Sequence, residues 1–427
     1  TNGSYCGLVS QTGGGYSFWQ SSGYDRITKK YPEETLLQDR PGRYVYIRDR
    51  DSGEYWSANW QPVCRNPVEW ESRHGMGYTV VSSKYNRIWT EITYFVPLQD
   101  DLEIWWVRLR NDGEETRRLK LFDFMEWNMG NNAFKLLESS FSKLFDNVFF
   151  SKGVIYATMR FWNVAVAGAQ INPNTDWGKY AFFAVNQEVD GYDCLKERFV
   201  GTNRNWSNPV AVTEGRCSNS HAFGRYAVAA FEHDLELIPG ETREYVVMLG
   251  IASTYDEVAD IKERYSDIGN VARSLTDIRS YWADYLKKVE IKTPHENFDL
   301  SVNYWNKYQA WVTSYWARMD SYYIGGGSII GFRDACQDIL GILPMEPEHQ
   351  YSDGSCIHNW DPVSDTGSKT GHSDDPLWLV MAVAEYIKET GDINFVDSKV
   401  DFYDGGIDTV LNHIHKALSY ALFSRSP

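Results

Sequence analysis

The hydrophobic pattern of this 427-residue chain changes its period near residue 254, and this change restricts the possible folds more than any other feature. Before it, short alternating runs are separated by turn residues. One example is "GRYVYIRDRDSGEYWSANW" (residues 42–60), where Asp51-Ser52-Gly53 separates two aromatic strands. Asp112-Gly113 and Pro239-Gly240 separate later strands in the same way. Many strands with short polar turns predict an antiparallel β-super-sandwich.

After residue 254 the apolar residues recur three and four positions apart, which is typical of helices. Residues 254–294 therefore predict a helical linker that ends at Pro294. In residues 297–323, four aromatic side chains fall on one stripe and predict the buried face of a helix: Tyr304, Tyr308, Trp311 and Tyr315. We expect this second part of the chain to contain helices and no strands.

A further helix is predicted in "SDDPLWLVMAVAEYIKETGD" (residues 373–392). Ser373 can cap its N-terminus, and Asp374 and Asp375 suit the positive end of the helix dipole. Gly391 suits its C-terminus, where a left-handed residue commonly ends a helix.

Composition excludes several classes of function. The net charge is −16 and no block of Lys or Arg occurs, which argues against a nucleic-acid partner. No run reaches the roughly 18 apolar residues of a membrane span. The six cysteines lie far apart without a paired spacing, so we expect buried thiols in a reducing cytoplasm. Aromatic residues make up 15% of the chain. We expect most of these side chains to pack in the core and a minority to form surfaces on which sugar rings stack.

The stretch "GGGSIIGFRDACQDILGILP" (residues 325–344) places Arg333, Asp334 and Asp338 in a glycine-led apolar run. An ion pair between Arg333 and Asp338 inside a helix is one interpretation. The other is a polar cluster at the mouth of a helical barrel that holds a polyhydroxylated ligand, because carboxylates and guanidinium groups form paired hydrogen bonds with sugar hydroxyls. The glycines permit close backbone approach and favour this second interpretation.

His358 and Trp360 lie in "DGSCIHNWDP" (residues 353–362). No His or Cys at ligand spacing accompanies His358, so we expect a hydrogen-bonded structural histidine and no metal site. For Trp360 we expect core packing rather than stacking on a sugar ring.

Several segments resemble one family. Residues 10–63, from "SQTGGG" to "NWQPV", resemble the β-domain of the inverting disaccharide phosphorylases of glycoside hydrolase family 94, which include the cellobiose and chitobiose phosphorylases. The motifs "GFRDACQD", "DGSCIHNWDP", "SDDPLWLVMAVAEYIKETGD" and "FYDGG" resemble, in the same order, segments of the family's (α/α)6 barrel. The resemblance implies a β-super-sandwich at residues 1–253, a helical linker at 254–294 and the N-terminal part of the barrel at 295–427.

The resemblance also implies a chemistry. Arg333 and Asp338 match positions that bind the hydroxyls of the transferred sugar, and Asp334 is a weaker candidate that supports Arg333. Such an enzyme is a glycosyltransferase, specifically a hexosyltransferase, that needs no cofactor, because inorganic phosphate is its co-substrate and attacks the anomeric carbon directly. The family further implies a homodimer whose ligands are a disaccharide and phosphate, and the cysteine pattern predicts a cytoplasmic location.

Two departures from the family pattern concern the catalytic machinery. The general acid is an Asp in a Trp-Asn-Asp motif, which this chain lacks, so we expect it and the phosphate-binding residues beyond Pro427. Residues 343–355, "LPMEPEHQYSDGS", leave out a helix that the family has there. We therefore expect the barrel to be incomplete in this chain, and we assign none of its residues as catalytic.

The substrate cues disagree. "GFRD" followed by "ACQD" resembles the glucose-transferring members, whereas "GRCSNS" (residues 215–220) resembles the chitobiose type. We expect phosphorolysis of cellobiose to α-glucose 1-phosphate and a free sugar, with chitobiose, laminaribiose and cellobionate phosphorylases as alternatives. An inverting, glucoamylase-like hydrolase would need a second carboxylate as base. A carbohydrate-binding protein without catalytic activity is the third class.

Overall fold

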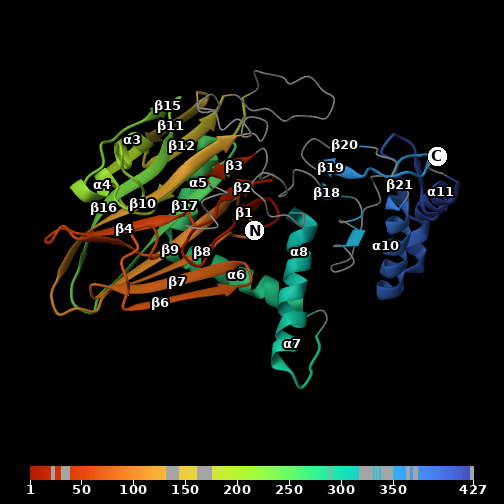
Figure 1. Cartoon of the computed structure of the whole chain (residues 1–427), viewed down its shortest axis with the longest axis horizontal. Helices are drawn as coiled ribbons and strands as arrows, with labels where there is room; N and C mark the ends of the chain where they lie inside the picture. Colours follow the sequence, from red (N-terminus) through yellow and green to blue (C-terminus); the bar gives the residue numbers. More distant parts are fainter. Residues whose placement is uncertain are drawn as a thin grey trace. The chain divides into compact units, whose positions relative to one another are not determined.

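A computed structural model of the protein describes most of the chain and divides it into two compact units (Figure 1). The first unit comprises most of residues 1–283, and the second comprises mainly residues 284–427. The described residues are 1–20, 25–29, 39–130, 144–160, 176–287, 290–316, 330–331, 333, 336–337, 350–361, 366–368 and 374–423.

Two antiparallel sheets build the first unit. The eight-stranded sheet contains β1 (Tyr5–Gly7), β2 (Ser17–Trp19), β3 (Arg26–Thr28), β4 (Tyr44–Asp49), β5 (Tyr55–Ser57), β10 (Arg117–Gly130), β14 (Gly191–Leu195) and β16 (Ala227–Leu237). The nine-stranded sheet contains β6 (Glu69–Gly75), β7 (Tyr78–Tyr85), β8 (Ile88–Phe95), β9 (Leu102–Asn111), β11 (Asp146–Ser151), β12 (Val154–Met159), β13 (Tyr180–Val185), β15 (Ala222–Phe223) and β17 (Thr242–Ala252). The predicted antiparallel β-architecture is confirmed.

The core of the first unit lies between the two sheets, and the eight-stranded sheet is buried on both faces. Val45 and Ile47 of β4 join the central core, while Tyr44 and Tyr46 of the same strand point the other way. They pack under two short helices, α3 (Lys196–Phe199) and α4 (Val210–Glu214). Strands buried on both faces need large apolar side chains on both, which accounts for much of the aromatic content.

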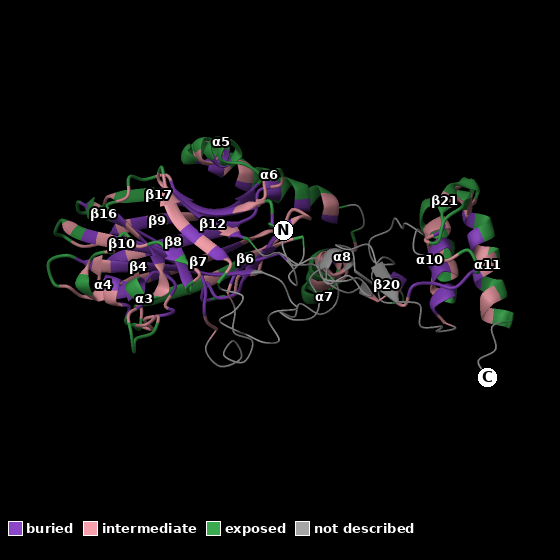
Figure 2. Cartoon of the chain, turned by 90° about the horizontal axis from the view of Figure 1, so that it is seen from above, coloured by how far each residue is buried: buried purple, intermediate pink, exposed green. Residues whose placement is uncertain are grey.

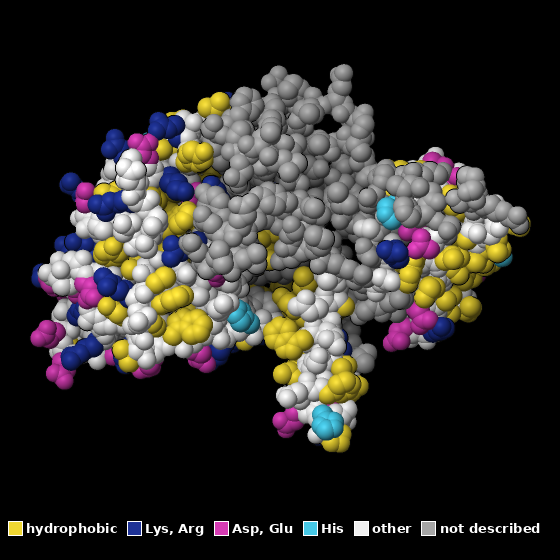
Figure 3. All heavy atoms as spheres, viewed as in Figure 1, with side chains coloured by type: hydrophobic (Ala, Val, Ile, Leu, Met, Phe, Trp, Pro, Cys, Tyr) yellow, Lys and Arg dark blue, Asp and Glu magenta, His cyan; other side chains and the backbone are white. Residues whose placement is uncertain are grey.

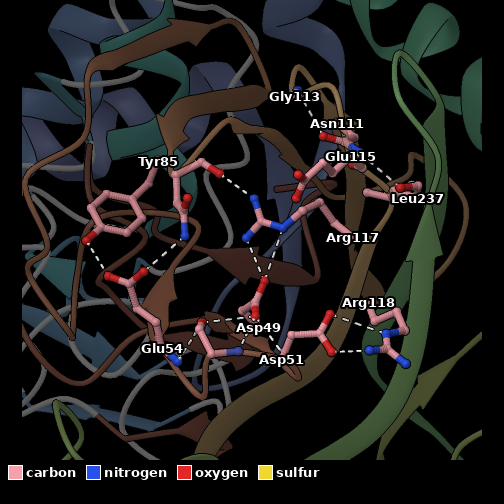
Figure 4. Close-up of polar contacts among 12 residues, drawn as sticks. Asp49, Asp51, Glu54, Tyr85, Asn111, Gly113, Glu115, Arg117, Arg118 and Leu237 are labelled. Atoms are coloured by element: carbon pink, nitrogen blue, oxygen red, sulfur yellow. Dashed lines mark hydrogen bonds and ion pairs between the residues drawn. The ribbon is translucent and has the colours of Figure 1, made fainter.

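The hairpin predicted within residues 42–60 is confirmed, because β4 pairs with β5 in the register Ile47↔Trp56. Asp49 holds the turn by accepting a hydrogen bond from the Ser52 backbone N–H at 2.7 Å, and Arg117 of β10 donates to it at 2.6 Å (Figure 4). Burial opposes ionisation of Asp49, but these hydrogen bonds outweigh it and lower the pKa of the carboxyl group.

The two other predicted turns are confirmed as strand separators, but each leads from one sheet to the other. Asp112-Gly113 joins β9 to β10, and Pro239-Gly240 joins β16 to β17. Buried Asn111 connects the two crossings, since its side-chain amide donates to the carbonyls of Glu115 and Leu237 at 2.7 and 3.0 Å (Figure 4).

Buried polar networks stabilise the interior of the first unit. Arg43 and Glu103, 1% and 2% exposed, form a bidentate ion pair in which Nη2 of Arg43 lies 2.7 Å from Oε2 of Glu103. Asp123 accepts from the hydroxyl of Tyr245 at 2.8 Å and lies 2.9 Å from Nε2 of His233. The buried charges of Arg43, Glu103 and Asp123 therefore have hydrogen-bonding partners, as burial requires.

The predicted helical segment after residue 254 forms two helices, α5 (Tyr255–Ser266) and α6 (Ile268–Leu286). Thr254 caps α5 by accepting from the backbone N–H of Glu257 at 3.1 Å. α5 packs on β13 and β17 through a buried stripe that includes Val258 and Ile261, and its exposed side faces away from the sheet (Figure 2). The helical period ends at Leu286, before the predicted boundary at Pro294.

The second unit contains helices and short strands, so the expectation of helices without strands was wrong. Its helical elements are α7 (Glu296–Leu300), a π-helical turn η2 (Ser301–Trp305), α8 (Asn306–Trp316), α10 (Asp375–Thr390), a 3-10 turn η3 (Ile393–Asp397) and α11 (Val410–Phe423). A three-stranded sheet contains β18 (Ile330–Gly331), β19 (Asn359–Asp361) and β20 (Thr366–Ser368), and β21 (Lys399–Asp401) pairs with β22 (Ile407–Thr409). Strands of two or three residues are too short to show a period.

The predicted aromatic stripe is only partly buried. Trp311 is buried, but Tyr304 is 43% exposed, and the side chain of Tyr315 lies outside the described residues. The π-helical turn explains the difference, because its wider turn shifts the helical phase by one residue. Asn303, eight residues before Trp311, is buried in place of Tyr304.

α10 confirms most of its sequence signals. Asp375 and Pro376 occupy its first turn, and Gly391 ends it with φ +72° while its N–H donates to the carbonyl of Ile387. The N-cap position is Asp374 rather than the predicted Ser373, which lies outside the described residues, and Asp374 makes no side-chain capping bond. The carboxylate of Asp374 instead forms an ion pair with Arg333.

Candidate sugar-binding site

Three segments of the second unit meet at the start of α10. Gly331 of β18 pairs with Asn359 of β19, and this pairing brings the segments that carry Arg333 and His358 together. Asp374 and Asp375, consecutive at the start of α10, each contact one of them. Two adjacent carboxylates thus hold two segments that are separate in sequence.

Arg333 and Asp374 form an accessible ion pair. Nη1 of Arg333 lies 3.3 Å from Oδ2 of Asp374, and the side chains are 51% and 49% exposed. Such a pair adds little to folding stability, because water solvates both charges. Among the described residues, this contact occupies one nitrogen of the guanidinium group and one oxygen of the carboxylate, so their other hydrogen-bonding positions can meet a polar ligand.

His358 and Asp375 form a second, more buried pair. Nδ1 of His358 lies 3.0 Å from Oδ2 of Asp375, whose side chain is 3% exposed. In the tautomer that carries a proton on Nδ1, the ring donates this hydrogen bond to the carboxylate. The predicted hydrogen bond of His358 is confirmed. The contact with His358 also gives the buried carboxylate of Asp375 a hydrogen-bonding partner.

Two buried thiols lie near Asp375. Burial, followed by the charge of Asp375, raises the pKa of Cys336 to about 12, and burial together with nearby acidic groups raises the pKa of Cys356 well above its usual value. Both side chains therefore stay protonated near neutral pH and do not act as nucleophiles. All six cysteines of the chain are free thiols.

The segment that leads to His358 is held by contacts with α11. Gln350 exchanges hydrogen bonds with buried His413, at 2.6 Å to its Nδ1 and 3.1 Å to its carbonyl. The ring of Phe402, from the "FYDGG" motif, stacks on His413 at 3.9 Å. Gly354 adopts φ +90°, and a side chain there would lie 2.3 Å from the carbonyl of Lys416. Only glycine fits this position, because its positive φ and the close approach of the Lys416 carbonyl exclude a side chain.

The arrangement is suited to bind hydroxyl groups rather than a metal. A guanidinium group, a carboxylate and an imidazole supply donors and acceptors at one place. Across the part of the chain that the structure describes, no group of three or more His, Cys, Asp or Glu side chains could hold a metal ion. Among the described helices, none has the length and apolar character of a membrane crossing.

The sequence-predicted site residues are placed only in part. Arg333 is described, whereas Asp334 and Asp338 lie outside the described residues, so the proposed Arg333–Asp338 pair stays a prediction. The same holds for residues 343–349 and for the side chain of Trp360. The sequence reasoning assigned Asp374 to the helix dipole and missed its contact with Arg333. The two consecutive carboxylates before Pro376 were the sequence feature that could have indicated a binding role for Asp374.

Fold and site together define a two-domain architecture of an antiparallel β-sandwich unit and a helical unit with a polar site. A bacterial glucoamylase complexed with acarbose has a similar fold, with a TM-score of 0.50 and 10% identity over 99% of this chain and 65% of that one. The family model "Glycosyl hydrolase 94, supersandwich domain" matches residues 1–268, and "Glycosyl hydrolase 94 superfamily, catalytic domain" matches residues 281–424. The chain belongs to the glycosyl hydrolase 94 family.

Characterised relatives are similar over nearly the whole chain. N,N'-diacetylchitobiose phosphorylase of Vibrio proteolyticus is 31% identical over 98% of this chain and 55% of its own length. Solabiose phosphorylase of Paenibacillus borealis is 28% identical over 89% of this chain and 48% of its own length. The chain thus spans about half the length of the relatives it matches.

Proposed function

We propose that the protein catalyses phosphorolysis of a β-linked disaccharide with inversion, as an enzyme of the hexosyltransferase type. The observation that carries the proposal is the match of both domains of the family in succession, with the relatives named as disaccharide phosphorylases. The accessible polar site around Arg333 in the second unit adds chemical support.

The reaction follows from elementary chemistry. A phosphate oxygen attacks the anomeric carbon as the glycosidic C–O bond breaks, and a carboxylic acid protonates the departing sugar oxygen. The proton lost from hydrogen phosphate balances the one that the acid supplies. Because phosphate is already an anionic nucleophile, the enzyme needs one catalytic acid rather than the acid and base of an inverting hydrolase. The expected products are an α-sugar 1-phosphate and a free sugar.

In this proposal Arg333 binds hydroxyls of the transferred sugar and Asp374 orients it. Asp338 is a second sugar-binding group and not the proton donor, because the pairing with Arg333 that the sequence predicts would favour an ionised carboxylate. Asp338→Asn should therefore reduce phosphorolysis equally for an ordinary disaccharide and for a β-glycoside with a dinitrophenolate leaving group, which needs no acid. Selective rescue by the activated glycoside would instead make Asp338 the general acid.

Incubating the full-length protein with a disaccharide, with and without phosphate, separates the three classes of function. Sugar 1-phosphate that appears only with phosphate supports the proposal. Free-sugar release that does not depend on phosphate would indicate an inverting hydrolase. Binding without turnover would indicate a carbohydrate-binding protein.

For the substrate, two candidates stand on different observations. Cellobiose rests on the glucose-type sequence around Arg333. N,N'-diacetylchitobiose is favoured by the 31% identity to a phosphorylase named for it. The "GRCSNS" cue adds little, because the hydroxyls of Ser218 and Ser220 both donate to Asp193 at 2.6 Å and order the loop. We therefore prefer N,N'-diacetylchitobiose, because the similarity to a phosphorylase named for it extends over 98% of this chain.

The ratio of kcat/KM values for N,N'-diacetylchitobiose and cellobiose decides between them, measured with excess phosphate on one preparation. A ratio well above one supports the diacetylchitobiose assignment, and a ratio well below one restores cellobiose. The homodimer and the cytoplasmic location stay predictions, which sedimentation and cell fractionation can check.

A further inference from the structure

β11, β12 and β13 are neighbouring strands of the nine-stranded sheet (Figure 1). Their outer face carries aromatic side chains where alternation predicts polar ones. The inward residues of these strands, such as Val148 and Ile155, are fully buried. The outward residues include Phe149, Tyr156 and Tyr180, and Tyr255 at the start of α5 lies beside them. We call the group Phe149, Tyr156, Tyr180 and Tyr255 the aromatic ridge.

The rings of the aromatic ridge contact one another, and their exposure differs: Tyr255 is exposed, Phe149 and Tyr180 are half-buried, and Tyr156 is buried. Phe149 stacks on Tyr156 at 5.7 Å, Tyr156 meets Tyr255 edge to face at 4.9 Å, and Tyr180 lies 4.4 Å from Tyr255. Tyr255 is 46% exposed, so the ridge is not an extension of the core. The neighbouring rings hold Tyr255 in place, and its exposed ring is a surface on which the apolar face of a pyranose ring can stack.

A cleft lies on each side of the aromatic ridge. One, of about 620 Å³, runs along α5 and is lined by Ser151, Lys262 and Glu263 as well as the ridge. The other, of about 750 Å³, is lined by Asn147, Thr158 and the 61% exposed Phe223. Phe149 and Tyr255 line both clefts. Both volumes fall in the range of about 300–1,000 Å³ that is typical of small-ligand sites, and a chain that crosses Tyr255 could enter both.

The polar lining favours a neutral ligand. The cleft along α5 contains two cations and two carboxylates: Lys152, Lys262, Asp256 and Glu263. The other contains Arg160, Lys179 and Asp176 among hydroxyl and amide groups. Charges of both signs also mix over the part of the surface that Figure 3 shows. A near-neutral cleft does not concentrate phosphate or nucleic acid, whereas hydroxyls, amides and single charges beside aromatic rings suit a polyhydroxylated chain.

The position of Lys262 adds a useful probe. Its Nζ donates to the carbonyl of Gly153 at 2.9 Å, and partial burial lowers the pKa of the amine. The amine is thus fixed at the wall of the cleft and is more readily deprotonated than an exposed lysine, so its reactivity should report whether the cleft is occupied.

We propose that the aromatic ridge and its two clefts form a binding site for a neutral β-linked oligosaccharide, with sugar units on both sides of Tyr255. The neutral, polyhydroxylated character follows from the ridge and its lining, and the β-linkage rests on the proposed function. Every lining residue belongs to the first unit, whereas Arg333 and Asp374 belong to the second.

Isothermal titration with cellopentaose and with chitopentaose, without phosphate, tests the proposal on the full-length protein. At least one pentasaccharide should bind, and Tyr255→Ala and Phe223→Ala should each weaken that binding about tenfold, as removal of a stacking anchor does. Because Phe223 is largely exposed, its variant should fold normally even if Tyr255→Ala does not. Trp70→Ala, an exposed aromatic residue of β6 outside the clefts, is the matched control and should bind normally.

Amine acetylation provides a readout without mutation: the bound pentasaccharide should slow labelling of Lys262 severalfold and leave exposed Lys287 unchanged. Phosphorolysis of a disaccharide should be the same in Phe223→Ala as in the parent. Unchanged pentasaccharide affinity in both Tyr255→Ala and Phe223→Ala, or unchanged labelling of Lys262, would overturn the site, even if phosphorolysis is found. Equal loss of disaccharide phosphorolysis in Phe223→Ala would make the clefts part of the catalytic site and also overturn the assignment.

Discussion

Replacing Arg333 with Ala should reduce activity without reducing stability. Its ion pair with Asp374 is half exposed, and pairs of this kind contribute less than about 1 kcal/mol to folding. A charge-assisted hydrogen bond to a bound sugar is worth about 1.5–3 kcal/mol. If that contact strengthens in the transition state, its loss lowers kcat/KM by about 10- to 150-fold. Arg333→Lys should not restore activity, because an ammonium group lacks the planar fork.

The assay pairs phosphorolysis kinetics with thermal unfolding of the same samples. Arg225→Ala is the matched control, since Arg225 forms a similarly exposed pair with Glu197 in the first unit. Both variants should unfold within a few degrees of the parent, and only Arg333→Ala should lose activity. Full activity in a folded Arg333→Ala variant would refute the sugar-binding role. A large loss of stability would show that Arg333 acts structurally.

Three further predictions concern the stability of the first unit and the burial of its side chains and of Cys336. Glu103→Gln should lower the free energy of unfolding by about 3–5 kcal/mol in urea titration, because it leaves a buried arginine without its charge partner; a loss under about 1 kcal/mol would contradict this. Hydrogen bonding from Arg110 lowers the pKa of Asp112 from 3.8 to about 2, so the stability that Asp112 contributes is present above about pH 4 and lost as the pH falls toward 2. The stability difference between the parent and Asp112→Asn should shrink over that interval, and a constant difference would argue against it. A thiol reagent should label half-buried Cys64 in the native protein but Cys336 only after unfolding; equal rates, followed by mass spectrometry, would contradict the assigned burial.

Local sequence signals predicted local structure well. The hairpin of Tyr44–Asp49 and Tyr55–Ser57 needed only an alternating pattern and a turn, and α10 needed only its period and Gly391. Asp112-Gly113 was recognised as a turn, but its role as a crossing between sheets depends on pairings such as Arg117↔Leu237, whose partners are far apart in sequence. The register between two distant strands cannot be predicted from the sequence of either strand alone.

The candidate site shows the same limit. The sequence predicts a pairing of Arg333 with Asp338, which stays a prediction, but it did not predict the described contact of Arg333 with Asp374, 41 positions away. Strands as short as Ile330–Gly331 carry no period, so nothing local predicted the sheet that brings His358 to this place. The phase shift at Ser301–Trp305 was hidden because a π-helical turn uses the same residue types as an α-helix.

The most direct test of phosphorolysis with inversion is the anomeric configuration of the first product. Proton NMR spectra recorded during the first minutes after disaccharide and phosphate are mixed with the full-length protein distinguish α- from β-sugar 1-phosphate by their anomeric couplings. A single displacement by phosphate at a β-linked sugar predicts the α-anomer alone. Formation of the β-anomer, or of free reducing sugar without any sugar phosphate, would contradict the account.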